Sequence, residues 1–117
     1  MRKLKIIGIT ITATLLLTIG HLKYGLFERF NFVTAYFDKW TGNERIIIYG
    51  EAFETDSIKI VTAPKLGFKY ERLEDCTVTS SFVNGVTDYN KIMGQVISKR
   101  LGESWDERLE REILTLK

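Results

Sequence analysis

The chain has 117 residues, of which 44% are hydrophobic and 27% are charged, and its formal net charge at pH 7 is +2. This length leaves room for one small domain, and for less if the N-terminus is a targeting or membrane segment. Residues 1–42 hold six Lys or Arg against two Asp or Glu, whereas residues 43–117 hold eleven against thirteen. The resulting balances of +4 and −2 give no concentrated basic face of the kind that nucleic-acid binding requires, so we expect no nucleic-acid partner.

The N-terminal segment has the features of a membrane anchor or of a signal peptide. Its first five residues (MRKLK) are basic, and the next fifteen (IIGITITATLLLTIG) carry no charge. The stretch from Leu4 to Leu22 is nineteen residues long, close to the roughly 20 that a transmembrane helix needs. A signal peptide also needs a small-residue cleavage site, for which only Thr18 and Gly20 are suited. We predict an uncleaved anchor over residues 1–23, with secretion after cleavage as the alternative.

The basic residues around this segment predict its orientation. Arg2, Lys3 and Lys5 precede the apolar run, whereas Lys23 and Arg29 follow it more sparsely. Cytoplasmic flanks of membrane helices carry the excess of Lys and Arg. We therefore predict a single-pass protein with a cytoplasmic N-terminus and an exported C-terminal domain, which would be periplasmic in a bacterium.

Residues 26–40 (LFERFNFVTAYFDKW) contain six aromatic residues in fifteen, in a chain that is 12% aromatic overall. Apolar residues recur there at steps of four, three, four and three, which predicts an amphipathic helix within residues 24–42. Directly after a membrane span, such a helix could lie at the lipid–water boundary. Alternatively, its aromatic stripe packs in the core of the domain. The candidates for membrane-interface contact are Lys23, Tyr24, Phe27, Phe30, Phe37 and Trp40.

The remainder, residues 43–117, predicts a small α/β domain, with α+β as the alternative class. Gly42 and Asn43 interrupt the preceding helix, and residues 45–49 (RIIIY) form a β-branched run typical of a buried strand. Residues 55–67 favour a short helix ending at Gly67, although their IKIVT segment also has strand propensity. Residues 68–73 alternate apolar and charged side chains, which predicts a second strand.

Two helices are predicted to complete the domain. The first follows N-cap candidates at residues 79–81, keeps a three-four apolar rhythm as far as Leu101, and stops at Gly102. Gly85 inside it predicts close packing against the sheet. The last helix opens with Ser104 and Glu107 as a capping box. If the two strands are parallel neighbours, the helix between them is a crossover, and the C-terminal helices must cover the sheet.

A search for catalytic chemistry centres on Cys76, the only cysteine. A single cysteine permits no disulfide within one chain, and a nucleophilic thiol normally has a nearby base. The only histidine, His21, lies at the membrane boundary, and the adjacent Glu74 and Asp75 disfavour a thiolate. We expect a structural thiol, no catalytic residues and no cofactor.

Acidic residues could in principle bind a hard cation. The carboxylates available are Glu71, Glu74, Asp75 and Asp88, but their spacing is not that of an EF-hand, and such runs usually belong to a solvated loop. We therefore expect no metal site.

Aromatic residues with polar neighbours mark one candidate partner surface. Asp88 and Tyr89 lie in the segment TDYN of the long predicted helix, and Trp105 begins the next helix. Tyr and Trp are enriched at binding hot spots. Alternatively, Tyr89 and Trp105 pack against each other across the two helices.

The layout resembles that of small single-pass bacterial envelope proteins, a likeness that transfers no residue roles. The sequence predicts a membrane-anchored, non-enzymatic interaction or accessory protein whose partners are the lipid bilayer and another protein of the same membrane. The alternatives are a small envelope enzyme or redox protein using Cys76, or an exported inhibitor or immunity-type binder.

Overall fold

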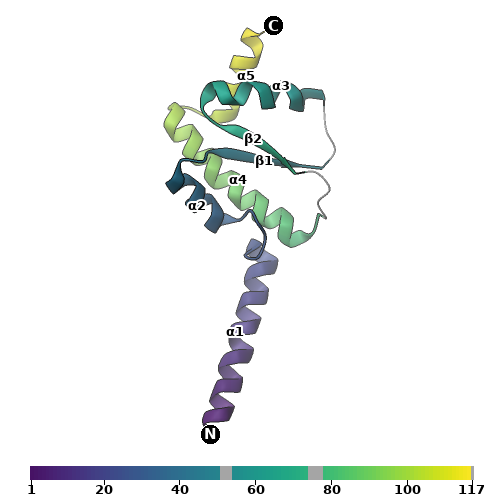
Figure 1. The fold of residues 1–117 in the computed structure, drawn as a ribbon, viewed down its shortest axis with the longest axis vertical. Helices are drawn as coiled ribbons and strands as arrows, with labels where there is room; N and C mark the ends of the chain where they lie inside the picture. Colours follow the sequence, from purple (N-terminus) through teal and green to yellow (C-terminus); the bar gives the residue numbers. More distant parts are fainter. Residues whose placement is uncertain (51–53, 74–77, 117) are drawn as a thin grey trace.

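In the computed structural model, one long helix projects from a domain in which helices pack around a small sheet (Figure 1). The structure describes residues 1–50, 54–73 and 78–116. The elements in chain order are α1 (Arg2–Tyr24), α2 (Phe32–Thr41), β1 (Arg45–Tyr49), α3 (Glu54–Thr62), the 3-10 helix η1 (Ala63–Leu66), β2 (Lys69–Leu73), α4 (Ser80–Leu101) and α5 (Trp105–Thr115). The predicted order of strand, helix, strand, helix and helix after residue 43 is confirmed.

Helix α1 projects from the domain (Figure 1), and none of its residues is buried. Its 23 residues correspond to about 35 Å of helix. Within the described part of the chain it is the one helix long and apolar enough to cross a membrane, and a signal sequence has the same features. Its threonine hydroxyls donate to the carbonyl oxygens four residues earlier, so these polar groups are paired on an otherwise apolar helix. They belong to Thr10, Thr12, Thr14 and Thr18.

The aromatic segment is not one helix, which corrects the prediction of a continuous helix over residues 26–40. Helix α1 ends at Gly25, whose φ of 63° is a left-handed conformation suited to glycine. Leu26 and Phe30 therefore lie in the connection before α2. Asn31 closes this connection: its amide oxygen accepts from two backbone N–H groups in the first turn of α2. Its amide nitrogen donates to three carbonyl oxygens of the connection.

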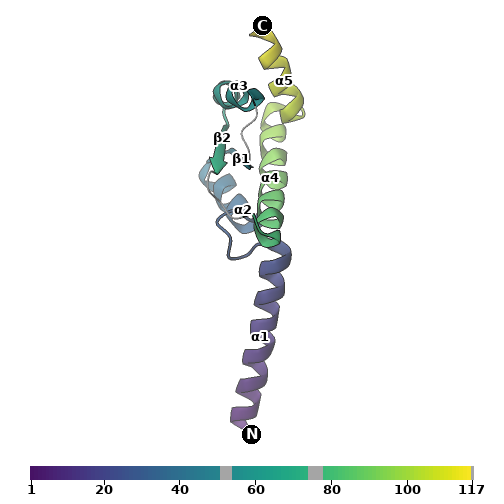
Figure 2. The ribbon, with the colours of Figure 1, turned by 90° about the vertical axis from the view of Figure 1, so that its right-hand side faces the viewer.

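Strands β1 and β2 form a two-stranded parallel sheet, with Arg45 opposite Lys69 and Tyr49 opposite Leu73. Helix α3 and η1 make the crossover between them, and α4 packs across the sheet (Figure 2). Asn90 of α4 pairs with the edge of β1, because its amide donates to the Ile47 carbonyl at 2.9 Å and accepts from the Ile47 N–H at 2.8 Å. One side chain thereby satisfies two backbone groups that a third strand would otherwise pair.

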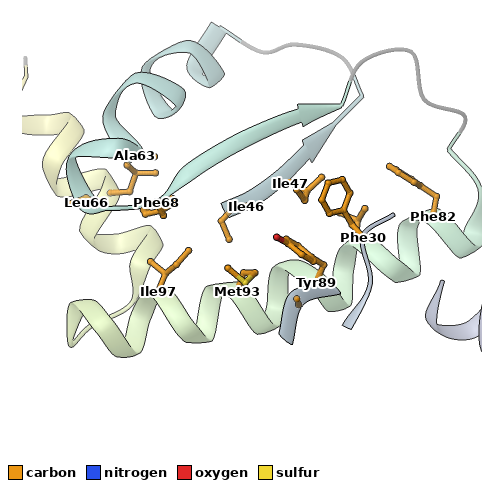
Figure 3. Close-up of a cluster of buried hydrophobic side chains, with 13 residues drawn as sticks. Phe30, Ile46, Ile47, Ala63, Leu66, Phe68, Phe82, Tyr89, Met93 and Ile97 are labelled. Carbon is orange, nitrogen blue, oxygen red and sulfur yellow. The ribbon is translucent and has the colours of Figure 1, made fainter. Parts of the chain in front are cut away.

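The core lies between α4, the sheet and η1 (Figure 3). The predicted three-four rhythm of α4 is confirmed by burial, since Val86, Tyr89, Met93 and Ile97 are all at most 1% exposed. Full burial of such apolar side chains contributes roughly 1.5–3 kcal/mol each. This face of α4 is therefore the main support of the small sheet.

Gly85 brings the α1–α2 connection, rather than the sheet, close to α4. A Cβ at Gly85 would lie 2.5 Å from the backbone oxygen of Phe30, and one at Gly25 would lie 2.5 Å from that of Ser81. Asn84 also donates to the Leu22 carbonyl oxygen at 2.9 Å. The domain is thus held directly against the end of α1.

Helix α5 begins at the predicted residue, but its capping box does not form. The Ser104 side chain makes no cap bond to the backbone and instead donates to the carboxylate of Asp106. This hydrogen bond, together with one from the Glu107 N–H, lowers the pKa of Asp106. Leu109 is buried, whereas Leu116 at the C-terminal end of the helix is exposed.

Candidate interaction surface

Helix α2 turns its apolar face outward. Val33, Tyr36, Phe37 and Trp40 have the spacing i, i+3, i+4 and i+7, which places them on one side of a helix. They are 53%, 56%, 59% and 85% exposed, respectively. Exposed apolar patches of this kind are typical of surfaces that contact a membrane or another protein.

The inner face of α2 carries Ala35, which is fully buried, and Asp38, which is 5% exposed. A carboxylate is removed from water at a large cost unless it is paired and hydrogen-bonded. The orientation of α2 therefore depends on what Asp38 meets inside the domain.

Asp38 meets Arg45 at the start of β1 and Tyr89 on α4. The Arg45 Nε and Nη2 atoms donate to Asp38 Oδ2 at 3.1 and 2.9 Å. The Tyr89 hydroxyl donates to the same carboxylate oxygen and accepts from Arg45 Nε at 2.9 Å. These three residues, which we call the Asp38 cluster, join α2, β1 and α4.

Glu71 and Phe30 complete the surroundings of Arg45. Glu71 on β2 accepts from Arg45 Nη1 at 2.5 Å, so the guanidinium lies between two carboxylates. The Arg45 guanidinium carbon is 5.0 Å from the centre of the Phe30 ring, a cation–π contact. The edge of Tyr89 meets the same ring at a centroid distance of 5.1 Å, as Figure 3 shows. Every buried side-chain polar atom of the described residues has a hydrogen-bond partner.

The electrostatics of the Asp38 cluster keep Tyr89 protonated. Burial of the phenol raises the pKa of Tyr89 above its ordinary value, and the hydrogen bond to Asp38 raises it further, against the opposing effect of Arg45. The neutral hydroxyl remains a donor to Asp38, so the cluster holds α2 in its orientation against β1 and α4.

Between α2 and α4 lie two adjoining hollows of about 410 and 480 Å3 that share Tyr36, Ile92 and Gln95. We call them together the α2–α4 groove. The hollow next to α1 is also lined by Tyr24, Phe32, Asp88 and Lys91. The hollow farther from α1 is also lined by Lys39, Glu44, Val96, Lys99 and Arg100.

The rim of the α2–α4 groove has an excess of positive charge. Arg100 is paired with Glu44 at 2.7 Å. Within the described residues, no carboxylate lies in ion-pair range of Lys39, Lys91 or Lys99. The three lysines therefore outweigh the one other acidic residue of the groove, Asp88.

Five of the six predicted membrane-interface residues are exposed, and the sixth, Phe30, is buried. Lys23 and Tyr24 lie in the last turn of α1, and the Tyr24 ring meets Phe32 edge-on at 5.9 Å. Phe27, Phe37 and Trp40 are exposed. Phe30, by contrast, is 2% exposed and belongs to the core, because the chain turns inward between α1 and α2.

The predicted partner-surface residues lie in three different environments. Asp88 is half-buried and lines the α2–α4 groove. Tyr89 is fully buried in the Asp38 cluster and so presents no surface. Trp105 is half-buried and packs edge-on against Phe68 at 5.7 Å rather than against Tyr89. Its indole would clash with any side chain at Gly94, where a Cβ would lie 2.7 Å from Nε1.

The candidate thiol Cys76 and its acidic neighbours Glu74 and Asp75 lie outside the described residues. Of the other carboxylates considered for a cation, Glu71 is paired with Arg45, and Asp88 lies on α4. The described residues contain no group of three or more potential metal ligands.

Sequence analysis missed the Asp38 cluster and the lysines of the groove. The available signals were Asp38 inside an aromatic helix and Arg45 at the head of an isoleucine run. Neither signal predicts the cluster, because Asp38 and Arg45 lie on different elements that pack together only in the fold, and Tyr89 is 51 positions from Asp38 in the chain.

Comparison with protein-family models, with curated proteins and with solved structures finds no significant match for this chain.

Proposed function

We propose that α1 anchors this protein in a membrane and that its domain serves as a non-enzymatic interaction or accessory module for another protein of that membrane. The N-terminus is cytoplasmic in this proposal, and the domain lies on the other side. The aromatic face of α2, formed by Val33, Tyr36, Phe37 and Trp40, is the contact surface.

The anchor is supported by the length of α1 and by the absence of buried residues along it. A soluble protein would leave 23 mostly apolar residues in water, at a cost of about 25 cal/mol for each Å2 of apolar surface. The basic residues Arg2, Lys3 and Lys5 at its start favour a cytoplasmic N-terminus.

The outward orientation of α2 is the observation that carries the proposed interaction. Three of its four exposed apolar side chains are aromatic, and Trp and Tyr are the residues most enriched among binding hot spots. The helix begins beside the end of α1, where Tyr24 meets Phe32. A partner in the same membrane is therefore within reach of this face.

Alkaline extraction of membranes with intact-mass analysis tests the anchor. We expect the uncleaved chain in the membrane pellet, because an apolar helix of this length is held by the hydrocarbon core. A soluble chain shortened near Gly20 would instead identify a signal peptide and contradict the anchor.

Site-specific photo-crosslinking in intact cells tests the contact surface. A photoreactive phenylalanine analogue replaces Phe37, and the same analogue at Val61 on α3, which is also exposed, is the control. We expect a discrete adduct with a membrane protein from position 37 only. No adduct at 37, or equal adducts at both positions, would contradict an interaction through α2.

A further inference from the structure

We propose that the α2–α4 groove binds an acidic amphipathic helix of the partner protein, running alongside α4 away from the membrane. This inference rests on the proposed function and adds the chemistry of the partner. Three features of the groove support it: its shape, its charge and its direction.

The shape of the groove suits one helix. It follows α4 from Asp88 to Arg100, and twelve residues of helix span about 18 Å, or roughly three turns. Tyr36, Ile92 and Val96 give it an apolar lining along that length. Grooves of this kind take the apolar side of a helix through residues at i, i+3, i+4 and i+7.

The charge of the groove selects acidic flanks on that helix. Lys39 lies on the α2 side, whereas Lys91 and Lys99 lie on the α4 side, so a bound helix has lysines along both of its edges. Glutamate or aspartate on both flanks of the apolar stripe would pair with these lysines. Complementary charge of this kind steers association and rejects basic segments.

The direction of the groove favours a polypeptide over a lipid headgroup. Helix α4 rises away from the end of α1 in both views (Figures 1 and 2). Lipid headgroups at the end of α1 could therefore reach only the part of the groove next to Tyr24. Lys99 and Arg100 line the farther hollow, where a helix that leaves the same membrane alongside α4 can reach them.

A peptide-binding measurement on the full chain tests the inference. The chain is placed in nanodiscs of zwitterionic phospholipid, and empty nanodiscs supply the blank. The probe is a fluorescent peptide of about 14 residues, roughly four turns, with leucines at i, i+3, i+4 and i+7 and glutamates on both flanks. A scrambled peptide of identical composition is its control. We expect saturable binding that weakens with salt and is at least about tenfold tighter than that of the scrambled peptide.

Charge-reversal variants assign this binding to the groove. Lys91→Glu with Lys99→Glu should weaken binding by about tenfold or more at low salt. The matched control is Lys65→Glu with Lys69→Glu, which makes the same charge change at exposed positions outside the groove and should leave binding unchanged. Tyr36→Ala should also weaken binding, whereas Val61→Ala should not.

Several results would overturn the inference. One is binding of the peptide that is no tighter than binding of the scrambled control. Another is an equal loss of peptide binding in the two charge-reversal pairs. Binding that disappears when anionic phospholipid replaces the zwitterionic lipid would assign the groove to headgroups. Self-association of the chain in detergent, abolished by Lys91→Glu with Lys99→Glu, would assign it to a second copy.

The two proposals fail separately. A crosslink at position 37 without peptide binding would leave the interaction module standing and remove the acidic helix. Peptide binding by a chain that extraction shows to be cleaved and soluble would keep the groove and remove the membrane anchor.

Discussion

Helices α2 and α4 both carry apolar side chains at helical spacing, but they present them in opposite directions. Helix α4 packs Val86, Tyr89, Met93 and Ile97 into the core. Helix α2 buries a carboxylate and leaves its aromatic residues in solvent. A hydrophobic stripe therefore identifies a face of a helix, and its contacts in the fold decide whether that face points inward.

The difference comes from which side of each helix finds a partner. Helix α4 lies against the sheet, where apolar surface is removed from water on both sides of the contact. On α2, Asp38 is bound by Arg45 and Tyr89, and these three groups satisfy one another only if α2 keeps its present rotation. Five variants can break or sharpen this contrast.

The largest effect is expected from Asp38→Ala. It leaves the largely buried Arg45 with Glu71 as its one counter-ion among the described residues and removes the acceptor of Tyr89, and loss of one partner from a buried ion pair costs about 3–5 kcal/mol. Guanidinium denaturation of the full chain in detergent, followed by tryptophan fluorescence, would measure this loss. Lys39→Ala, at the adjacent exposed position, is the control. A loss below about 1 kcal/mol would show that the cluster does not hold α2.

The next largest effect is expected from Ile97→Ala on α4. Ile97 is fully buried, and truncating such a side chain costs on the order of 3 kcal/mol through lost burial and the cavity left behind. Hydrogen exchange should show faster exchange along α4 and the sheet. Val96→Ala, at a half-buried position beside it, should cost less. Equal losses would mean that the inward face of α4 does not carry the core.

Tyr89→Phe should have a smaller and pH-dependent effect. At neutral pH it removes hydrogen bonds to Asp38 and Arg45, at a cost of roughly 1–2 kcal/mol. Because folding raises the pKa of Tyr89, the free energy of unfolding of the native protein should fall as pH rises above about 10, where the unfolded chain loses this proton first.

Tyr89→Phe removes the titrating phenol, so the variant should lack this fall in stability. The difference in free energy of unfolding between the two proteins should therefore narrow above about pH 10. Burial raises the pKa of Tyr70 to about 12 and adds the same pH dependence to both proteins. Tyr70→Phe in each background would separate the two tyrosines. A gap that stays constant across this range would contradict a protonated Tyr89 in the cluster.

The smallest effect on stability is expected from Phe37→Ser and Trp40→Ser. Both side chains are exposed, and surface substitutions usually change stability by less than about 0.5 kcal/mol. In the Trp40 variant, Trp105 remains as a fluorescence probe of unfolding near the core. A large destabilisation would show that the aromatic face is packed within the domain. Unchanged stability of the Trp40 variant, with loss of the crosslink from position 37, would instead support a contact surface.

Much of the domain could be predicted from local patterns. The isoleucine run of β1 and the caps at Thr79 and Gly102 act within a few residues, so the strand and α4 were placed closely. The break between α1 and α2 is hard to predict, because the apolar rhythm of residues 26–40 continues past Asn31 and begins directly after Gly25. The side chain of Asn31 interrupts the helix, because it hydrogen-bonds to backbone groups both before and after it in the chain.

The candidate site was harder to predict. Exposure of Phe37 and Trp40 agrees with the proposed interface, whereas Phe30 and Tyr89 proved to be core residues. All four residues are aromatic with polar neighbours, and that pattern does not separate an exposed ring from one buried against an arginine.

The sequence by itself determined the apolar N-terminal helix, the two strands and the helices that follow them, because hydrophobic periodicity and caps depend on neighbours within one or two turns. Only the tertiary structure decided which way α2 faces, where Arg45 finds its counter-ions, and that α2 and α4 enclose a lysine-rimmed groove. Several of the contacts behind these features join residues more than 25 positions apart, such as Arg45 with Glu71 and with Tyr89. Their energies depend on burial, which exists only once the elements have packed.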